Sequence, residues 1–315
     1  MTVLGTVLFG EPGRVAEDIA LAASLGFGIV RLDIPWAAAQ PKPDTVNGDV
    51  TEALLGLAEL ARQSGVQPWF RLLQPQVPRW FDNDGGFTDA RNAGHWWPRW
   101  VETAADVFGG AAAGWVPFEA PFAMARRLIP DDPRTHGELI DTLVTAWRDA
   151  WRLLRGGPPV MTALDVAVVR PDDDSPPAIE AAARFDQLRW GVWLDGLRDG
   201  LVSIPGRADR HVADLDGACD IVGLAVRGDA ETVLYRAAEQ GPERPLALTF
   251  RPTGDNDAQR SAAVQTMWRG TRRAAAELAL HSVTITPFAD QLPGNDGIVT
   301  RDRELKDAGR SFLAR

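Results

Sequence analysis

The stretch WVPFEAP, residues 115–121, has the composition of a short buried strand that ends on a carboxylate. Its apolar residues lead to Glu119, and Pro121 stops the strand soon afterwards. A polar side chain at the carboxyl end of an apolar strand is where a (β/α)8 barrel carries its chemistry. The alternative is a charged residue that opens a solvent-exposed loop. The rest of the chain decides between these two interpretations.

Apolar, strand-like runs recur along the whole chain and alternate with segments whose apolar residues repeat at helical spacing. This alternation predicts a parallel sheet, and eight strand–helix pairs without a linker predict one (β/α)8 TIM barrel, a single domain over residues 1–315. Residues 82–94 are expected to form a turn-rich excursion. The expected strands cover residues 3–9, 29–34, 66–73, 115–119, 160–169, 220–226, 246–250 and 282–286, and the expected helices cover residues 14–25, 54–65, 97–108, 135–155, 178–199, 229–240, 256–279 and 303–313.

The composition excludes several classes of partner and cofactor. A formal charge of −10 and a pI near 5.0 argue against nucleic acid or an anionic membrane as partner. The sequence contains no apolar run of membrane-spanning length and does not begin with a signal peptide, so we expect a cytoplasmic protein. Cys219 is the sole cysteine, the four histidines lack ligand spacing, and no glycine-rich phosphate loop is present. We therefore expect no metal and no cofactor.

In a closed barrel, the strands would bring charged and aromatic residues together at one mouth. Trp96, Trp97 and Trp100 have two open placements, at the edge of this mouth or in the packing between helices and barrel. The polar residues expected in the mouth are Arg31, Asp33, Arg71, Gln74, Glu119, Asp165, Arg227, Thr249, Arg251 and Thr286, and the aromatic residues expected to line it are Trp36, Trp69, Trp80 and Phe250.

Five motifs, in order and spacing, resemble those of glycoside hydrolase family 1, the β-glucosidase-like retaining glycosidases. The stretch WVPFEAP is similar to the family's WITFNEP, and LTFRP at residues 248–252 is similar to its ITENG. The resemblance covers roughly residues 17–315 and implies the same barrel. Its motifs lie at residues 17–36, 65–78, 115–121, 248–260 and 297–302.

The resemblance also implies that the family's usual chemistry is absent. A retaining glycosidase needs two carboxyl groups about 5–5.5 Å apart. The family's nucleophile falls on Phe250 and its acid/base on Ala120, and its sugar-binding histidine falls on Gln74. Arg31 matches the family arginine beneath the nucleophile. Because a buried arginine is costly without a partner, we expect Asp33 or Glu119 to pair with it.

Three functions stay open at this point. The favoured one is a repurposed acid/base enzyme of the lyase, cyclase or isomerase type that acts on a small non-glycoside molecule. The second is a non-catalytic binding or partner protein whose carboxylates only neutralise arginines. The third is an atypical glycoside hydrolase that uses Glu119 as its acid. In the favoured reading Glu119 and Asp33 are catalytic, and the substrate-binding residues are Arg31, Trp36, Arg71, Gln74, Arg227, Phe250, Arg251 and Thr286.

Overall fold

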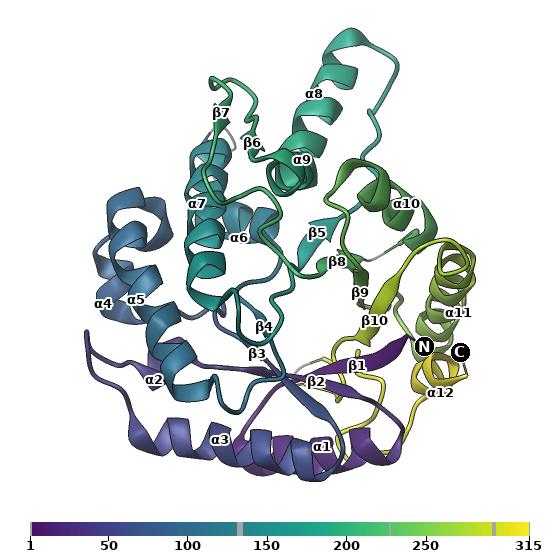
Figure 1. The fold of residues 1–315 in the computed structure, drawn as a ribbon. Helices are drawn as coiled ribbons and strands as arrows, with labels where there is room; N and C mark the ends of the chain where they lie inside the picture. Colours follow the sequence, from purple (N-terminus) through teal and green to yellow (C-terminus); the bar gives the residue numbers. More distant parts are fainter. Residues whose placement is uncertain (1, 131–134, 227, 292–293, 315) are drawn as a thin grey trace.

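A computed structural model describes residues 2–130, 135–226, 228–291 and 294–314. Eight parallel strands form one sheet in the order β4-β3-β2-β1-β10-β9-β8-β5, with the helices outside it (Figure 1). This arrangement confirms the predicted (β/α)8 barrel. The strands are β1 (Val3–Leu8), β2 (Ile29–Asp33), β3 (Gln67–Arg71), β4 (Gly114–Val116), β5 (Leu164–Val166), β8 (Val222–Val226), β9 (Leu246–Phe250) and β10 (Leu280–Ile285).

The ring of strands closes between β4 and β5, each of which has only three residues. A parallel bridge joins Trp115 to Val160, just before β5. Beyond it, the Ala120 N–H donates to the Ala163 carbonyl at 2.8 Å. Few regular ladder bonds therefore hold this junction, and the strand expected over residues 160–169 is much shorter than predicted.

Most expected helices are present, together with short ones that were not predicted. The turn-rich excursion ends earlier than predicted because Asp89 caps the helix α5, accepting hydrogen bonds from the N–H groups of Arg91 and Asn92. The main helices are α1 (Pro12–Ser24), α3 (Gly48–Gln63), α5 (Ala90–Phe108), α7 (His136–Leu154), α8 (Pro176–Asp186), α9 (Val192–Asp199), α10 (Ala230–Gln240), α11 (Asp257–Ala274) and α12 (Asp307–Leu313). The additional elements are α2 (Trp36–Ala39), α4 (Arg79–Asn83), η1 (Gly86–Thr88), α6 (Pro121–Leu128), the π-helix η3 (Gln187–Gly191) and the hairpin of β6 (Leu201–Val202) and β7 (Arg210–His211).

Trp69 fills the base of the barrel and does not line its mouth, contrary to the prediction. It packs in a buried cluster with Ile29, Val116 and Met161 from three other parts of the ring. The indole of Trp69 lies so close to Gly114 that a Cβ on residue 114 would approach the indole to 2.4 Å, so only glycine fits there. Trp69 therefore closes the barrel below the mouth.

An aromatic cluster lies outside the barrel, between α2, α4 and α5. Trp36 is at its centre, fully buried, and stacks on Trp100 with ring centroids 5.5 Å apart. Its indole N–H donates to the side-chain oxygen of Gln40 at 2.8 Å. The placement of Trp36 in the mouth was therefore wrong, and Trp97 and Trp100, whose placement was open, belong to the buried packing.

In the part of the chain that the structure describes, no helix has both the length and the apolarity to cross a membrane.

Candidate functional site

A cavity of about 590 Å³ opens at the carboxyl ends of the strands, where a barrel of this kind carries its site. We call this cavity the mouth. Six residues predicted to lie in the mouth line it, namely Arg71, Glu119, Asp165, Thr249, Arg251 and Thr286. Strand ends and the segments directly after them position all six, which explains why the sequence pattern could find them.

Arg71 joins two carboxylates at the edge of the mouth. Asp33 and Arg71 are register partners on β2 and β3, and the guanidinium holds Asp33 with two hydrogen bonds, from Nε at 2.7 Å and from Nη2 at 2.6 Å. Its Nη1 donates to Oε2 of Glu119 at 2.7 Å. No hydrogen bond involves the other oxygen of Glu119 among the described residues, and Glu119 lines the mouth. One carboxylate oxygen is thus positioned and a second is open to a ligand.

Burial and ion pairing shift the pKa values within this group in opposite senses. Burial lowers the pKa of Arg71, but the charges of Asp33 and Glu119 outweigh it, and the net shift is upward. Burial raises the pKa of Asp33, and Arg71 opposes that shift. Arg71 therefore stays charged at any pH at which the protein is folded, and it is the permanent cation of the group.

Arg31 lies beneath this group and does not make the predicted ion pair. Its Nε and Nη1 atoms have no hydrogen-bond partner among the described residues, and Nη2 reaches only the Met161 sulfur at 3.8 Å. Burial lowers the pKa of Arg31 to about 10, against the opposing field of Glu119. The expectation that Asp33 or Glu119 pairs with Arg31 was wrong, because both carboxylates turn to Arg71. Arg31 does not line the mouth.

A strained turn connects β4 to α6 and shapes the mouth next to Glu119. Ala120 has φ 52° and ψ 61°, in the left-handed backbone region that residues other than glycine rarely adopt. Asp165 then caps α6, accepting hydrogen bonds from the N–H groups of Phe122 and Ala123 at 3.1 and 3.2 Å. Burial raises the pKa of Asp165 to about 6, with Arg189 opposing it. Asp165 therefore titrates close to neutral pH inside the mouth.

Two arginines complete the mouth and were not predicted. Arg126, on the exposed side of α6, makes no ion pair within the described chain. Arg189 lies in η3, and its Nε donates to the Asp165 backbone carbonyl at 3.0 Å. The π-helical turn around Arg189 is a feature often found at functional sites. Neither side chain follows a strand, so a search at strand ends could not find them.

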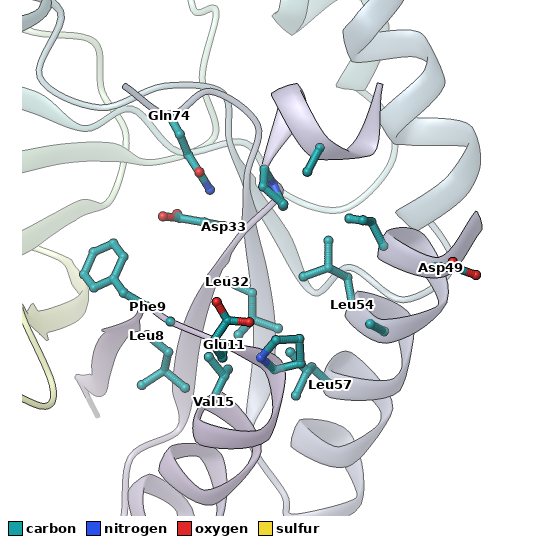
Figure 2. A pocket seen from close by; sticks show the side chains of 16 residues that line it. Leu8, Phe9, Glu11, Val15, Leu32, Asp33, Asp49, Leu54, Leu57 and Gln74 are labelled. Carbon is teal, nitrogen blue, oxygen red and sulfur yellow. The ribbon is translucent and has the colours of Figure 1, made fainter. Parts of the chain in front are cut away.

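Besides Arg31 and Trp36, four more predicted site residues lie outside the mouth or outside the described chain, namely Phe250, Gln74, Asp33 and Arg227. Phe250 faces away from the mouth and lines a groove between α10 and α11, because neighbouring residues of β9 point to opposite sides and Thr249 takes the inward position. The prediction that Phe250 lines the mouth was therefore wrong. Gln74 lines a different cavity, shared with Asp33 (Figure 2). Arg227 lies outside the described residues.

The cavity drawn in Figure 2 lies between β1, β2, α1 and α3, and we call it the side cavity. It adjoins the mouth. Phe9 lines both cavities, Asp33 lines the side cavity, and Arg71 lines the mouth. The Arg71 guanidinium lies 5.6 Å from the centre of the Phe9 ring. Phe9 and the Asp33–Arg71 ion pair thus form a wall between an acidic cavity and an arginine-rich one.

The mouth is equipped for proton transfer and for binding an anion. Its described lining includes four arginines and the three carboxylates of Glu119, Asp165 and Asp296. Within the described ranges, His, Cys, Asp and Glu form no group of three or more that could hold a metal ion. Cys219 is buried, and burial raises its pKa to about 12. The arrangement favours acid/base chemistry over nucleophilic thiol chemistry.

Comparison with known sequences gives a limited match. No model of a known protein family matches the chain. A stretch of 111 residues is 28% identical to 6-phospho-beta-glucosidase AscB of Escherichia coli (strain K12), covering 33% of this chain and 23% of AscB. The chain thus matches less than a quarter of the length of that curated relative.

Comparison with solved structures shows the fold clearly. The chain is similar to a beta-glycosidase from Pyrococcus horikoshii, with a TM-score of 0.82 and 18% identity over 94% of this chain and 82% of that one. It is also similar to the GH1 beta-glucosidase from Exiguobacterium antarcticum B7, with a TM-score of 0.84 and 15% identity over 99% and 96%. A family 1 β-glucosidase from Thermotoga maritima is similar with a TM-score of 0.81 and 15% identity, over 96% of this chain and 86% of that one. The chain has the barrel of the family 1 β-glucosidases, as its motifs indicated.

Proposed function

We propose that this protein is a family 1-like barrel that has lost retaining glycosidase chemistry and acts as an acid/base enzyme on a small, anionic, non-glycoside molecule. Glu119 is the proton-transfer group. The observation that carries this proposal is the position of Glu119 in the mouth, with one oxygen fixed by Arg71 and the other without a hydrogen bond to any described residue. A carboxylate held in this way takes a proton from a bound substrate and returns it at a neighbouring atom.

The arginines of the mouth support an anionic substrate. The charge of Arg71 is already compensated by Asp33 and Glu119, and Arg251 pairs with Asp296. Arg126 has no such partner within the described chain, and Arg189 lies 4.0 Å from the nearest Asp165 oxygen. In this proposal Arg126 and Arg189 take the substrate-binding role assigned from the sequence to Arg31, Arg71 and Arg227, and they do so by binding an anionic group. A carboxylate or phosphate group between them would be held by charge-assisted hydrogen bonds.

The absence of retaining chemistry rests on two positions. Ala120, aligned with the family's acid/base, lines the mouth but carries no carboxyl group. Phe250, aligned with the nucleophile, faces the helix layer instead of the mouth. The two-carboxylate geometry that retention needs is not provided by these residues. Because the curated relative is described as acting on a phosphorylated glucoside, 6-phospho-β-glucosides belong in the test panel.

The test is proton exchange in D₂O, followed by ¹H NMR over a panel of small carboxylated and phosphorylated metabolites. An acid/base enzyme exchanges a substrate C–H for deuterium even where net turnover is slow. We expect exchange with at least one compound, and Glu119→Gln should slow it by roughly 10²–10⁴-fold. The control is Glu180→Gln, a change at a side chain that is 77% exposed on α8. Exchange that survives Glu119→Gln would assign the chemistry to another group.

A second function, a non-catalytic binding protein, is favoured by one observation. Both Asp33 and Glu119 are tied to Arg71, as expected if these carboxylates only neutralise a partly buried cation. In that case no compound would exchange, and Glu119→Gln would weaken binding of an anion little or not at all. Hydrolysis of an aryl glycoside that depends on Glu119 would instead support the atypical glycosidase.

A further inference from the structure

The side cavity has a volume of about 560 Å³ and mainly apolar walls. Leu54 and Leu57 of α3 form one side, and Leu32 of β2 also lines the cavity (Figure 2). Phe9 and Asp33 lie at the opposite end, next to the wall shared with the mouth. Its volume falls in the range of sites for small organic molecules, which are concave and mostly apolar with a few polar groups.

The charge of the side cavity is opposite to that of the mouth. Three carboxylates, Glu11, Asp33 and Asp49, are among its sixteen described lining residues, and none of the sixteen is a lysine or an arginine. The chain as a whole has 33 lysines and arginines, and four arginines line the described part of the mouth next door. A cavity with this lining attracts a cation and disfavours an anion.

Two polar groups in the side cavity have no structural task among the described residues. Glu11 precedes α1 at the capping position, yet its side chain makes no capping hydrogen bond and no ion pair with a described residue. Figure 2 shows its carboxylate directed into the cavity, whereas Asp49 points away. The Gln74 amide also makes no hydrogen bond within the described ranges. Asp33, in contrast, is already held by Arg71 with both of its oxygens.

We propose that the side cavity binds a small molecule that carries a protonated amine on an apolar body. The apolar body packs on Leu54 and Leu57, and the ammonium donates to the carboxylate of Glu11 and to the side-chain carbonyl of Gln74. Charge complementarity selects this occupant, because an ammonium has only donors and both groups can accept. The site is separate from the mouth and does not depend on the function proposed for it.

The test compares three ligands of similar size by titration calorimetry: 2-phenylethylammonium, the neutral 2-phenylethanol and the anion phenylacetate. We expect the ammonium to bind about tenfold more tightly than the alcohol, and the anion not to bind. Glu11→Gln should weaken binding of the ammonium by about threefold to fivefold, as expected for a charge pair at the rim of a site. Glu52→Gln is the matched control, since Glu52 carries the same charge on exposed α3 surface without lining the cavity.

A filling substitution separates the side cavity from other binding places. Ala53 is exposed on α3 and lines the cavity, so Ala53→Trp fills it without removing a buried group. We expect this variant to fold normally and to lose ammonium binding. The proposal is overturned if the alcohol binds as tightly as the ammonium, or if no binding of the ammonium is measurable. It is also overturned if the Ala53→Trp variant still binds the ammonium, or if Glu52→Gln weakens ammonium binding as much as Glu11→Gln does.

Discussion

Replacing either of the two interior arginines with methionine should have very different effects on stability, although both changes remove one positive charge from the same small region. Arg71→Met leaves the carboxylates of Asp33 and Glu119 without the donor that holds them. Both side chains are at most 20% exposed, so water compensates little. Breaking a buried ion pair on one side costs about 3–5 kcal/mol, and we expect about 3 kcal/mol here.

Arg31→Met should cost less than about 1 kcal/mol or stabilise the protein. Burial lowers the pKa of Arg31 to about 10, which corresponds to roughly 3 kcal/mol of unfavourable free energy for keeping the charge inside. Two of its N–H-bearing nitrogens have no partner among the described residues, so few hydrogen bonds are lost. Methionine keeps most of the contact with the interior.

The assay is urea unfolding followed by the fluorescence of the twelve tryptophans. The loss in free energy of unfolding caused by Arg71→Met should become smaller as the pH falls. Without Arg71 the pKa of Asp33, already raised by burial, rises further, so the folded variant binds a proton that the unfolded chain releases. Arg62→Met is the control, since its pair with Glu59 is about half exposed and should contribute less than about 1 kcal/mol. Equal losses for Arg31→Met and Arg71→Met would refute the electrostatic reasoning.

Three further predictions test the remaining parts of the structure. The folded-state pKa of Asp165, raised to about 6, means that lowering the pH from 7 to 5 should add about 1 kcal/mol of stability; urea titrations should show that Asp165→Asn lacks this gain. The Cys219 thiol, with a pKa raised to about 12, should not react with a disulfide reagent until the protein unfolds, and reaction of the native protein at the rate of a free thiol would contradict its burial. Combining Phe250→Glu with Ala120→Glu should not produce aryl glucosidase activity, and it should destabilise the protein by at least about 3 kcal/mol, because the carboxylate at position 250 would be buried against helices.

The sequence predicted the barrel because the signals for it are local. Each strand is a short apolar run between turn residues, the long helices carry an apolar periodicity, and some of them have a side-chain cap, as in α3 with Asn47. The carboxyl ends of the strands then identify the mouth without any coordinates, and Glu119, Arg71, Arg251 and Thr286 were found in this way. The limits of some elements, such as β5, depend on pairing across the ring and were less accurate.

The facing of individual side chains could not be predicted in the same way. The strand LALTF, residues 246–250, is buried along its whole length, so hydrophobicity does not show whether Thr249 or Phe250 faces the mouth. Arg31 and Arg71 lie on neighbouring strands and both offered a partner to Asp33. The register of β2 and β3 determines that Arg71 is the partner, since Asp33 lies directly opposite Arg71. Arg126 and Arg189 reach the mouth through the packing of α6 and η3, which no local pattern contains.

The junction between β4 and β5 has a consequence for motion. Local opening of a protein begins where backbone hydrogen bonds are few and extends outward from there. Short strands and few backbone hydrogen bonds hold the ring at this junction, which carries Glu119, the strained Ala120 and Asp165. Amide hydrogen exchange should therefore be faster at residues 114–120 and 160–166 than in β1, β2, β9 and β10. We therefore expect the segments that shape the mouth to adjust to a bound molecule more readily than the opposite half of the barrel.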